Sequence, residues 1–375
     1  MLVEATFLER INRFSVKCTI GDKTVCAYLP NPGRLVELLL KDTKVYLVKS
    51  NIPTRQMAFT CFAVERDGYP VLLDTHYNNV VAKKLIEEGS IEYLKGYDIL
   101  KEEYAVGRSR FDFLLSKNNK KLILEVKSCT LFNKDIAMFP DAPTVRGKKH
   151  IEDLASLRNR GFDCSILFLV HSGRVKYFLP EYHTDLDFAK TLYANKDKLI
   201  IRAVSVTCDS KLNFLKDTKE LDIPWNFIKD QLEDKGSYLV ILKVKEDIIV
   251  TVGSIGDIKF DRGYYVYVGS AMSNLTKRIE RHRRKIKKLF WHIDYLMNNS
   301  QIVAILPVRS CERLECDIAK SIKAISQNTI LNFGSSDCNC DGHLFKFSDN
   351  PIYLKAFIDI ILYYRMDHIS GYLKC

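Results

Sequence analysis

Hydrophobic residues alternate with polar ones on both sides of the polar stretch 116–121, and this pattern constrains the fold of the chain most. Before the stretch the alternating residues are Phe111 and Phe113, and after it they are Leu122, Leu124 and Val126. A period of two residues is typical of strands, and a short polar segment between two such runs is typical of a turn. The pattern therefore predicts a β-hairpin whose turn lies between Asn118 and Asn119.

Three charged residues of this hairpin, Asp112, Glu125 and Lys127, are predicted to form a site for a divalent cation. The register places Asp112 opposite Glu125 with their Cβ atoms about 5 Å apart, where two carboxylates repel each other unless a cation offsets the repulsion. Strand periodicity places Lys127 on the same face as Glu125. Mg²⁺ or Mn²⁺ prefers such oxygen ligands, and the lysine could orient a nucleophile or neutralise a pentavalent phosphate. Taken alone, the bare pattern favours the alternative of an exposed hairpin whose charges are only solvated.

Length and composition indicate a folded protein of two or three domains, because 47% of the 375 residues are hydrophobic. The net charge of +11 favours polyanionic partners, although charge alone does not separate nucleic acid from an anionic membrane surface. The longest hydrophobic runs are too short to span a bilayer, and the first residues are acidic where a signal peptide needs a basic start. We therefore expect a cytoplasmic protein with no membrane partner. Scattered cysteines among hydrophobic neighbours favour reduced thiols over disulfides.

Glycine, proline and charged residues divide the chain into segments. Residues 1–75 suit a small closed barrel, with short β patterns at 14–20, 24–29, 44–49, 57–65 and 71–74. Residues 76–228 indicate an α/β domain, with helices at 78–88 and 147–160 and strands at 110–115, 121–127, 165–171, 175–179 and 199–206. We interpret the charged stretch 229–236 as a linker to a third domain at 237–347, followed by an aromatic-rich helical tail at 348–375.

Basic residues gather at two places in the first two domains. The loop 31–34 presents the guanidinium of Arg34, and a rigid connection before residue 147 delivers Arg146, Lys148, Lys149 and His150 to the start of a helix. Basic side chains beside a helix N-terminus are well placed to hold a phosphate. A solvated helix start, and a barrel that only packs on its neighbour, fit these patterns equally well.

Several separated motifs resemble the sugar fermentation stimulation protein A (SfsA) family over about residues 1–228. They are Asn31-Pro32-Gly33-Arg34, Arg110-Phe111-Asp112-Phe113, Glu125-Val126-Lys127-Ser128, and Phe139-Pro140-Asp141-Ala142-Pro143-Thr144 with Arg146-Gly147 and His150. The resemblance implies an N-terminal barrel of the OB type, a domain similar to PD-(D/E)xK nucleases, and association with DNA. Carried over, it makes Asp112 and Glu125 metal ligands and Lys127 the catalytic lysine. The residues expected to contact nucleic acid here are Arg34, Arg110, Arg146, Lys148 and His150. The family is named for a regulatory phenotype, so the resemblance leaves open whether DNA is cut or only bound.

The third domain resembles a GIY-YIG-like domain of unknown function often found in archaea, over about residues 236–347. The matching motifs are Gly236-Ser237-Tyr238, Gly263-Tyr264-Tyr265-Val266-Tyr267-Val268-Gly269 and Trp291-His292-Ile293-Asp294-Tyr295. Tyrosines on two paired strands can position a water or share a proton beside a phosphate. The resemblance implies Tyr238 or Tyr267 near the nucleophile, Arg278 for the transition-state charge and Glu315 as the metal ligand. Taken alone, aromatic strand residues are more often core.

Two helices are expected to carry this chemistry. The first, at 274–289, is dense in basic residues and is expected to bind nucleic acid through Lys277, Arg281 and Arg284. Arg278 and His282 lie four residues apart and share one face that suits contact with phosphate. The second helix, at 312–325, places Glu312 and Glu315 on one face, and an ordinary surface glutamate is the alternative reading of Glu315.

A loop at residues 333–345 contains two cysteines and a histidine. Cys338, Cys340 and His343 could bind zinc, but their spacing differs from that of zinc fingers and no fourth ligand is identifiable. We therefore favour a loop positioned by its glycines and by Ser and Asp caps over a zinc site.

The leading hypothesis is a metal-dependent nuclease that hydrolyses phosphodiesters with one site in each half of the chain. A DNA-binding regulatory protein without catalysis is the rival class, and a binder should hold DNA equally well in EDTA. RNA processing is a weaker alternative, since basic barrels and metal sites serve either polymer. The sequence favours DNA over RNA and leaves the oligomeric state open.

Overall fold

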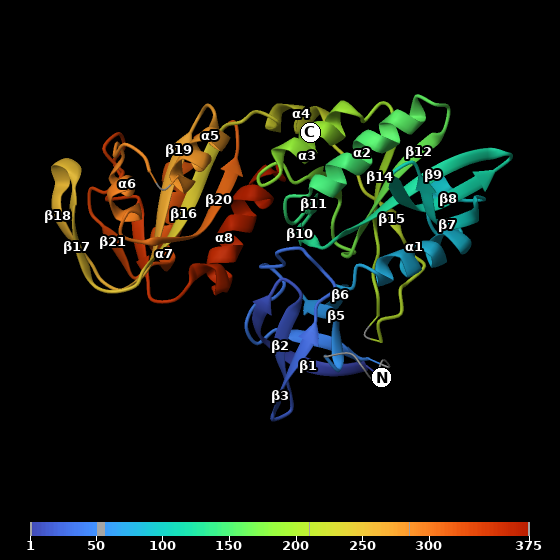
Figure 1. Cartoon of the computed structure of the whole chain (residues 1–375), viewed down its shortest axis with the longest axis horizontal. Helices are drawn as coiled ribbons and strands as arrows, with labels where there is room; N and C mark the ends of the chain where they lie inside the picture. The colour runs from blue at the N-terminus through green and yellow to red at the C-terminus, as the bar shows by residue number, and fades with distance from the viewer. Residues whose placement is uncertain (1, 51–56, 210, 285, 374–375) are drawn as a thin grey trace. The chain divides into compact units, whose positions relative to one another are not determined.

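The computed structural model describes residues 2–50, 57–209, 211–284 and 286–373, and these form an α/β multidomain protein. Two compact units divide the chain between Lys229 and Asp230. The first unit contains the barrel and the first α/β domain, drawn from blue to yellow-green in Figure 1, and the second contains the remaining sheet and helices. No helix of the described ranges is long and apolar enough to cross a bilayer.

Residues 2–50 and 57–72 form the predicted OB-like barrel. Its strands are β1 (Leu2–Asn12), β2 (Ser15–Ile20), β3 (Lys23–Tyr28), β4 (Lys44–Lys49), β5 (Phe59–Arg66) and β6 (Tyr69–Leu72). The sheet order is β3-β2-β1-β4-β5-β6, and a parallel pairing of β3 with β5 closes it. The sequence patterns missed β1, because its pairing with β2 shifts register twice and only Ala5 and Phe7 of the strand are buried.

The second domain is the predicted PD-(D/E)xK nuclease-like α/β fold. Its elements are α1 (Tyr77–Glu87), η1 (Glu92–Leu94), β7 (Asp98–Val106), β8 (Ser109–Lys117), β9 (Lys120–Cys129), β10 (Leu131–Asn133), β11 (Ile136–Phe139), α2 (Val145–Arg158), β12 (Asp163–Val170), β13 (Tyr177–Pro180), α3 (Leu186–Ala194), β14 (Ile200–Ser205), β15 (Lys219–Glu220) and α4 (Trp225–Gln231). The main sheet has the order β15-β14-β12-β9-β8-β7, and β10, β11 and β13 form a smaller sheet.

Strands β8 and β9 form the predicted hairpin in the predicted register, from Lys117 opposite Lys120 to Phe113 opposite Leu124. Its turn residues Asn118 and Asn119 both have positive φ, 50° and 63°, as a two-residue hairpin turn requires. Helices α1 and α2 pack into two separate hydrophobic clusters that both include residues of β8, β9 and β12, so the sheet is covered on both faces.

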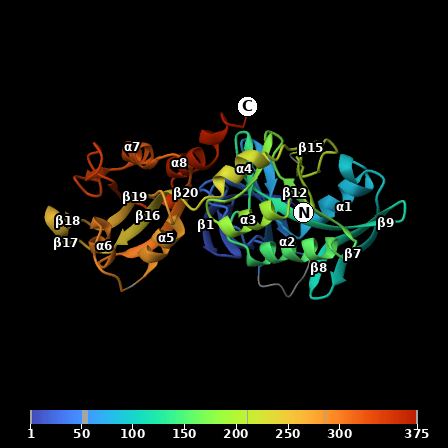
Figure 2. The ribbon, with the colours of Figure 1, turned by 90° about the horizontal axis from the view of Figure 1, so that it is seen from above.

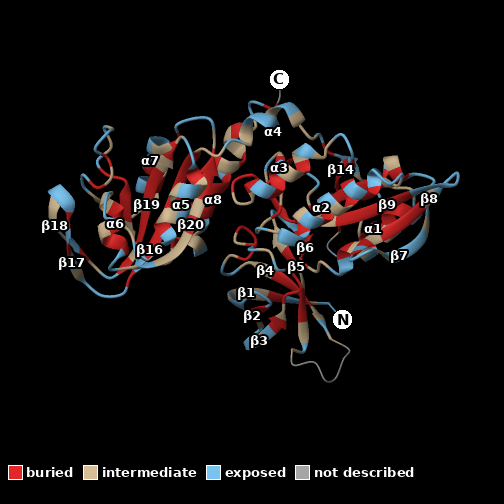
Figure 3. Ribbon diagram, turned by 45° about the horizontal axis from the view of Figure 1, so that its top comes forward, coloured by how far each residue is buried: buried red, intermediate tan, exposed pale blue. Residues whose placement is uncertain are grey.

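The second unit is built on a five-stranded sheet of order β20-β16-β19-β22-β21. Its elements are β16 (Gly236–Val244), β17 (Ile248–Val252), η2 (Gly253–Ile255), β18 (Gly256–Phe260), β19 (Gly263–Ala271), α5 (Leu275–Arg283), α6 (His292–Met297), β20 (Gln301–Arg309), α7 (Glu315–Ile325), β21 (Asn328–Ile330), β22 (Leu344–Phe347), η3 (Pro351–Tyr353), α8 (Lys355–Arg365) and η4 (Asp367–Ile369). Figure 2 shows α5 and α6 on one side of this sheet and α7 and α8 on the other. Buried residues line β16 and β19, whereas much of the β17–β18 hairpin is exposed (Figure 3).

Two helices of the second unit are shorter than predicted. Helix α5 ends at Arg283 instead of residue 289, and Lys287 donates to the carbonyl oxygen of His282 at 3.3 Å, which satisfies a carbonyl group at the helix end. Helix α7 begins at Glu315, so Glu312 is not on its face as expected, and its carboxylate lies 3.0 Å from His368. The predicted tail helix is present as α8, where Arg365 donates to the carbonyl of Pro307 at 2.7 Å, and residues 374–375 lie outside the described part.

Candidate active sites

Asp112 lies where the ladder between β8 and β9 stops. The last paired residues are Phe113 and Leu124, and the next backbone donor on β9, the amide of Val126, donates to Asp112 Oδ2 at 2.7 Å. Asn79 of α1 donates to the other carboxylate oxygen at 2.7 Å. The carboxylate is therefore fixed by donors from two elements and stands beside Glu125, as the register predicts.

Phe111 and Phe113 lie in two different hydrophobic clusters, although strict alternation along a strand would place both on one face. Phe111 belongs to the cluster that contains Ile151 of α2, whereas Phe113 belongs to the cluster that contains Leu85 of α1. Strand β8 is irregular between the two phenylalanines, because its pairings with both neighbouring strands omit Asp112.

Glu125 is 3% exposed and has two side-chain partners on one oxygen. Its Oε1 accepts a short hydrogen bond from Lys127 Nζ and lies 2.5 Å from His150 Nδ1. Its Oε2 is buried and has no hydrogen-bond partner among the described residues. A buried carboxylate oxygen without a partner is costly in the interior, and a cation would satisfy it.

The two carboxylates differ in how readily they ionise. Burial, followed by the charge of Glu125, raises the pKa of Asp112 to about 6, and the hydrogen bonds from Val126 and Asn79 only partly oppose this. Burial alone would also raise the pKa of Glu125, but the charges of Lys127 and His150 and their hydrogen bonds lower it. The site without a cation thus combines a stable carboxylate with one that titrates close to neutrality.

A cleft of about 1000 Å³ opens onto these carboxylates within the first unit. One wall is the barrel loop 31–33, and the other includes Lys127 and the segment 139–144. The backbone amide of Leu35 donates to Asp141 Oδ2 at 2.7 Å, and a Cβ on Gly33 would lie 2.7 Å from the same oxygen. The barrel loop can therefore approach this wall only with glycine at position 33.

The predicted nucleic-acid contacts of this unit fall into two groups. Arg110 and Arg146 line the cleft, and Arg34 is exposed beside the loop that forms its wall. Lys148 is not placed in the cleft lining and lies 4.0 Å from Asp187. His150 was expected to contact phosphate, but it is 5% exposed and faces Glu125, because its helix packs on the sheet.

Sequence reasoning missed Asn79, the donor to Asp112. Its position on α1 lies 33 residues before the aspartate, and no local spacing connects the two. His150 was identified as a functional residue through its motif, but its role as the partner of Glu125 was not. Only the packing of α2 against β9 reveals that pairing.

Two tyrosines on paired strands form the centre of the second unit's candidate site, as the motifs predict. Tyr238 on β16 and Tyr267 on β19 are 1% and 7% exposed, and their ring centroids lie 6.4 Å apart. Tyr238 Oη lies 2.9 Å from His282 Nε2. A Cβ on Gly269 would lie 2.7 Å from Tyr238 Oη and 2.9 Å from Tyr267 Cε1, so glycine is required there.

The electrostatics keep this tyrosine–histidine pair uncharged near neutral pH. Burial raises the pKa of Tyr238 to about 12 even though the charge of Arg278 opposes the shift. Burial, followed by the charge of Lys287, lowers the pKa of His282 to about 4. His282 was expected to face phosphate along with Arg278, but it is 1% exposed and faces Tyr238 instead.

Arg278 and Glu315 both contact Ser270. The guanidinium of Arg278 is 4.0 Å from the ring of Trp291 and 3.5 Å from the carbonyl oxygen of Ser270. Glu315 Oε2 accepts a short hydrogen bond from the Ser270 hydroxyl, and its Oε1 lies 3.2 Å from His343 Nδ1. The structure therefore brings together all the residues that the GIY-YIG resemblance assigns to catalysis.

The basic segment after the tyrosines divides into structural and exposed residues. Arg281 was expected to contact nucleic acid, but it donates to both oxygens of the fully buried Asp294 at 3.0 and 2.8 Å. Lys287 lies 3.2 Å from the same carboxylate. Lys277 and Arg284 are exposed, as nucleic-acid contact requires.

The fold and the first site define a class of protein in which an OB barrel precedes a restriction-endonuclease-like domain. Family models agree along the chain: residues 8–73 match the SfsA N-terminal OB domain, and residues 76–212 match the sugar fermentation stimulation protein RE domain. Residues 237–365 match a domain of unknown function, DUF123. The chain belongs to the sugar fermentation stimulation protein family.

Individual relatives support this membership. The chain is 37% identical over 190 residues to a sugar fermentation stimulation protein homolog of Methanothermobacter thermautotrophicus, covering 51% of this chain and 79% of that protein. It is 35% identical over 215 residues to a homolog of Clostridium kluyveri, covering 57% and 93%. A solved structure of Pyrococcus furiosus SfsA in complex with Ca²⁺ is similar with a TM-score of 0.56 and 28% identity, covering 60% of this chain and 96% of that one.

Proposed function

We propose that this protein is a metal-dependent nuclease that hydrolyses phosphodiesters in DNA, with its principal site at Asp112, Glu125 and Lys127. The main observation behind this proposal is the buried Oε2 of Glu125, which has no hydrogen-bond partner among the described residues. Because a second carboxylate, Asp112, is close enough to interact with Glu125 electrostatically, a bound cation would offset both the buried oxygen and the repulsion. The Ca²⁺ complex of Pyrococcus furiosus SfsA supports a cation-binding fold, since Ca²⁺ also prefers oxygen ligands.

Asp112 and Glu125 would hold Mg²⁺ or Mn²⁺, which supplies polarisation of the scissile phosphate and a lowered pKa for an attacking water. Asn79 and the amide of Val126 keep the Asp112 carboxylate in place, and His150 does so for Glu125. Lys127 is 18% exposed and points to the same carboxylate oxygen as His150. From there its ammonium can stabilise negative charge that develops on the phosphate.

Nucleic acid is the substrate that best fits this cleft, because basic residues line it. Arg110 and Arg146 line it, Arg13 lies on the barrel side, and the chain as a whole carries a net charge of +11. Phosphate contacts of this kind position a strand without reading its sequence. DNA is favoured over RNA because the family resemblance associates the fold with DNA.

We also propose a second phosphodiesterase site in the second unit, at Tyr238, Tyr267, Arg278 and Glu315. Tyr238 can exchange a proton with the neutral His282 at 2.9 Å, which suits it to the activation of a nucleophile. Arg278 lies on the rim of the same cluster with its guanidinium stacked on Trp291, where it can stabilise charge on a phosphate.

Cleavage of end-labelled single-stranded, duplex and branched DNA, and of RNA, tests both sites. The full chain is compared with Asp112→Ala, Glu315→Ala and the double variant, in Mg²⁺, Mn²⁺ or EDTA. We expect EDTA to abolish cleavage, each single variant to lose one activity, and salt-dependent affinity to persist in all variants.

The alternative outcomes separate the function classes. DNA binding that is equal in Mg²⁺ and EDTA, with no cleavage of any substrate, would identify a regulatory DNA-binding protein. Cleavage and tighter binding of RNA at fixed salt would identify an RNA-processing enzyme. Wild-type cleavage by both single variants would exclude the assigned residues.

A further inference from the structure

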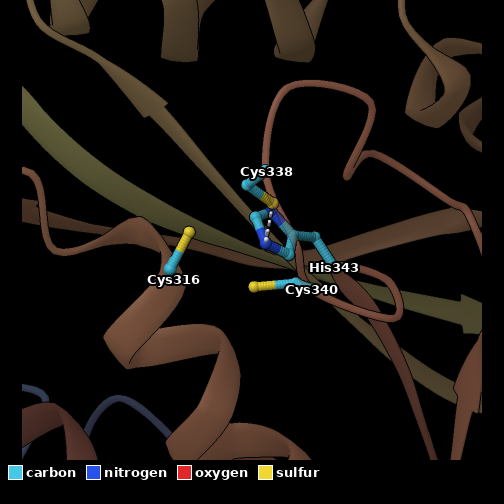
Figure 4. A group of neighbouring side chains, drawn as sticks. All are labelled: Cys316, Cys338, Cys340 and His343. Atoms are coloured by element: carbon cyan, nitrogen blue, oxygen red, sulfur yellow. Dashed lines mark hydrogen bonds between the residues drawn. The ribbon is translucent and has the colours of Figure 1, made fainter.

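We propose that the second unit contains a structural zinc site formed by Cys316, Cys338, Cys340 and His343. The ligand atoms of these residues all lie within 4.8 Å of one another. Figure 4 shows the three sulfur atoms and the imidazole gathered around one point, with Cys316 coming from α7 and the other residues from the loop before β22. The sequence around Cys338, Cys340 and His343 offered no fourth ligand. In the structure, Cys316 of α7 takes that place.

The spacing of the four atoms suits a small tetrahedral ion. Zinc–sulfur bonds of about 2.3 Å place the sulfurs of a tetrahedral site about 3.8 Å apart. Cys338 Sγ lies 3.5 Å from His343 Nε2, which is already close to this separation. Small side-chain rotations would bring the remaining atoms, at most 4.8 Å apart, to the same distance.

The orientation of His343 is independent support for a metal. Its Nε2 faces the cysteines, while its Nδ1 lies 3.2 Å from Glu315 Oε1. Metal-bound histidines characteristically donate their second ring N–H to a carboxylate, which fixes the tautomer that leaves the other nitrogen free to bind. His343 is 1% exposed, so this arrangement is held by its surroundings.

The backbone around the cluster holds the ligands in place. Cys316 is the second residue of α7, so its sulfur is carried by a regular helix. The loop is fixed at its base by the amide of His343, which donates to the carbonyl of Phe333 at 2.8 Å. Lys323 of α7 pairs with Asp341, the residue after Cys340, and this ion pair is a second link between the loop and α7.

The ligand set selects zinc over the ions proposed for Asp112 and Glu125. Thiolates and imidazole are soft or borderline ligands that favour Zn²⁺ in a closed tetrahedral site, whereas Mg²⁺ and Mn²⁺ prefer oxygen. Four protein ligands leave no open position, which is typical of a structural rather than a catalytic zinc. The site would tie the loop to α7 and hold Glu315 through His343.

Metal content and cobalt spectroscopy of the untagged full chain test the proposal. Protein produced with added zinc should retain one equivalent of zinc after gel filtration. Replacement of that zinc by Co²⁺ should give the intense visible bands of a tetrahedral thiolate complex, and X-ray absorption should report a shell of three sulfurs and one nitrogen. Cys316→Ser and Cys340→Ser should lose this retained zinc.

Cys311→Ser is the matched control, because Cys311 is an exposed free cysteine close to α7 but outside the cluster. It should keep the full zinc content. Glu315→Gln should keep the ligands but weaken zinc binding by about 10- to 100-fold, since it alters the partner of the histidine.

Wild-type protein that purifies without zinc and gives no thiolate bands on Co²⁺ addition would overturn the proposal, and this result does not depend on whether any variant folds. A shell that lacks sulfur would overturn it as well. Full zinc retention by Cys316→Ser would exclude the fourth ligand assigned here. Circular dichroism of each variant shows whether its zinc loss reflects a missing ligand or an unfolded unit, and an unfolded variant leaves the wild-type spectra to decide.

Discussion

The side chain of Asp112 takes the hydrogen bond from the amide of Val126 that a continued β8–β9 ladder would give to a backbone carbonyl. Burial of the same carboxylate, followed by the negative charge of Glu125, raises its pKa to about 6. One side chain thus accepts the hydrogen bond at the end of a strand pairing and carries a carboxylate that titrates at mildly acidic pH.

Metal affinity should depend on pH through Asp112. Since a cation binds the carboxylate form, Mn²⁺ affinity should rise about tenfold per pH unit below the pKa of about 6 and level off above it. In the metal-free protein the native state binds the extra proton, so stability should fall as pH rises from 3.8 to about 6. Calorimetric titration of Mn²⁺ across this range measures the first effect. Asp112→Asn should bind weakly at every pH, and an equal slope in that variant would assign the proton elsewhere.

His150 should act as a positioning residue for Glu125. His150→Ala should weaken Mn²⁺ binding by about 10- to 100-fold, because the carboxylate loses a partner that lowers its pKa. His150→Asn, whose amide can replace the Nδ1 donor, should restore most of the affinity. Lys148→Ala on the same helix is the control and should bind metal normally, since Lys148 only approaches Asp187 at 4.0 Å. Equal affinities for all three variants would remove His150 from the site.

Gly269→Ala should destabilise the second unit by about 1–3 kcal/mol, as overpacking of a filled interior does. The new methyl group would lie 2.7 Å from Tyr238 Oη and 2.9 Å from Tyr267 Cε1, so both rings must move. Urea unfolding followed by the fluorescence of Trp291, in a Trp225→Phe background, reports this unit separately. Gly371→Ala has open space around its Cβ and should be neutral. A neutral Gly269→Ala would show that the tyrosines are not packed as described.

Asp294 should stabilise the second unit in a pH-dependent way. Burial alone would raise its pKa, but hydrogen bonds from Arg281 and from the amides of Trp291 and Phe290 lower it from 3.8 to about 2. Its stabilisation, about 2 kcal/mol, should be complete above pH 3.8 and disappear as pH falls through about 2.

Asp294→Asn should lack this component of the pH dependence, and it should be less stable by about 3 kcal/mol near neutrality because Arg281 and Lys287 lose their shared partner. Urea unfolding at a series of pH values, with the exposed Asp349→Asn as control, measures both effects. Parallel pH profiles for wild type and Asp294→Asn would contradict the assignment.

Salt dependence should distinguish the basic residues of α5 and its C-terminal end. Lys277→Ala and Arg284→Ala should each reduce the slope of log affinity against log salt by about 1 without loss of stability, because both side chains are exposed. Arg281→Ala should instead destabilise the unit, because it leaves Asp294 with fewer partners. Fluorescence anisotropy with labelled DNA at several salt concentrations measures the slopes, and unchanged slopes for Lys277→Ala and Arg284→Ala would place the interface elsewhere.

Local patterns predicted the hairpin and its register because both are set by neighbouring residues. Alternation defines the strands, and Asn118 and Asn119 tolerate the positive φ of a two-residue turn. The paired tyrosine strands followed from their motifs in the same way. The register alone therefore placed Asp112 beside Glu125 before any tertiary contact was known.

Tertiary pairings were not accessible in this way. Helix packing brings together residues that are far apart in the sequence. It places Cys316 beside the loop cysteines, Asn79 beside Asp112, and His150 beside Glu125. Charge density on α5 indicated nucleic acid, but it could not show that Arg281 neutralises the buried Asp294. The end of a helix was equally hard to place where side chains such as Lys287 satisfy its last carbonyl groups.

The hydrogen bond from Leu35 to Asp141 has a consequence for how the first unit can be divided. A fragment that began at residue 76 would keep Asp112 and Glu125 but lose both the barrel loop and the amide that Asp141 accepts from. Separate production of the two domains would therefore open one side of the cleft and leave a carboxylate without its donor. The barrel and the nuclease-like domain share one wall of the cleft, and they should be cloned, exchanged or engineered only together.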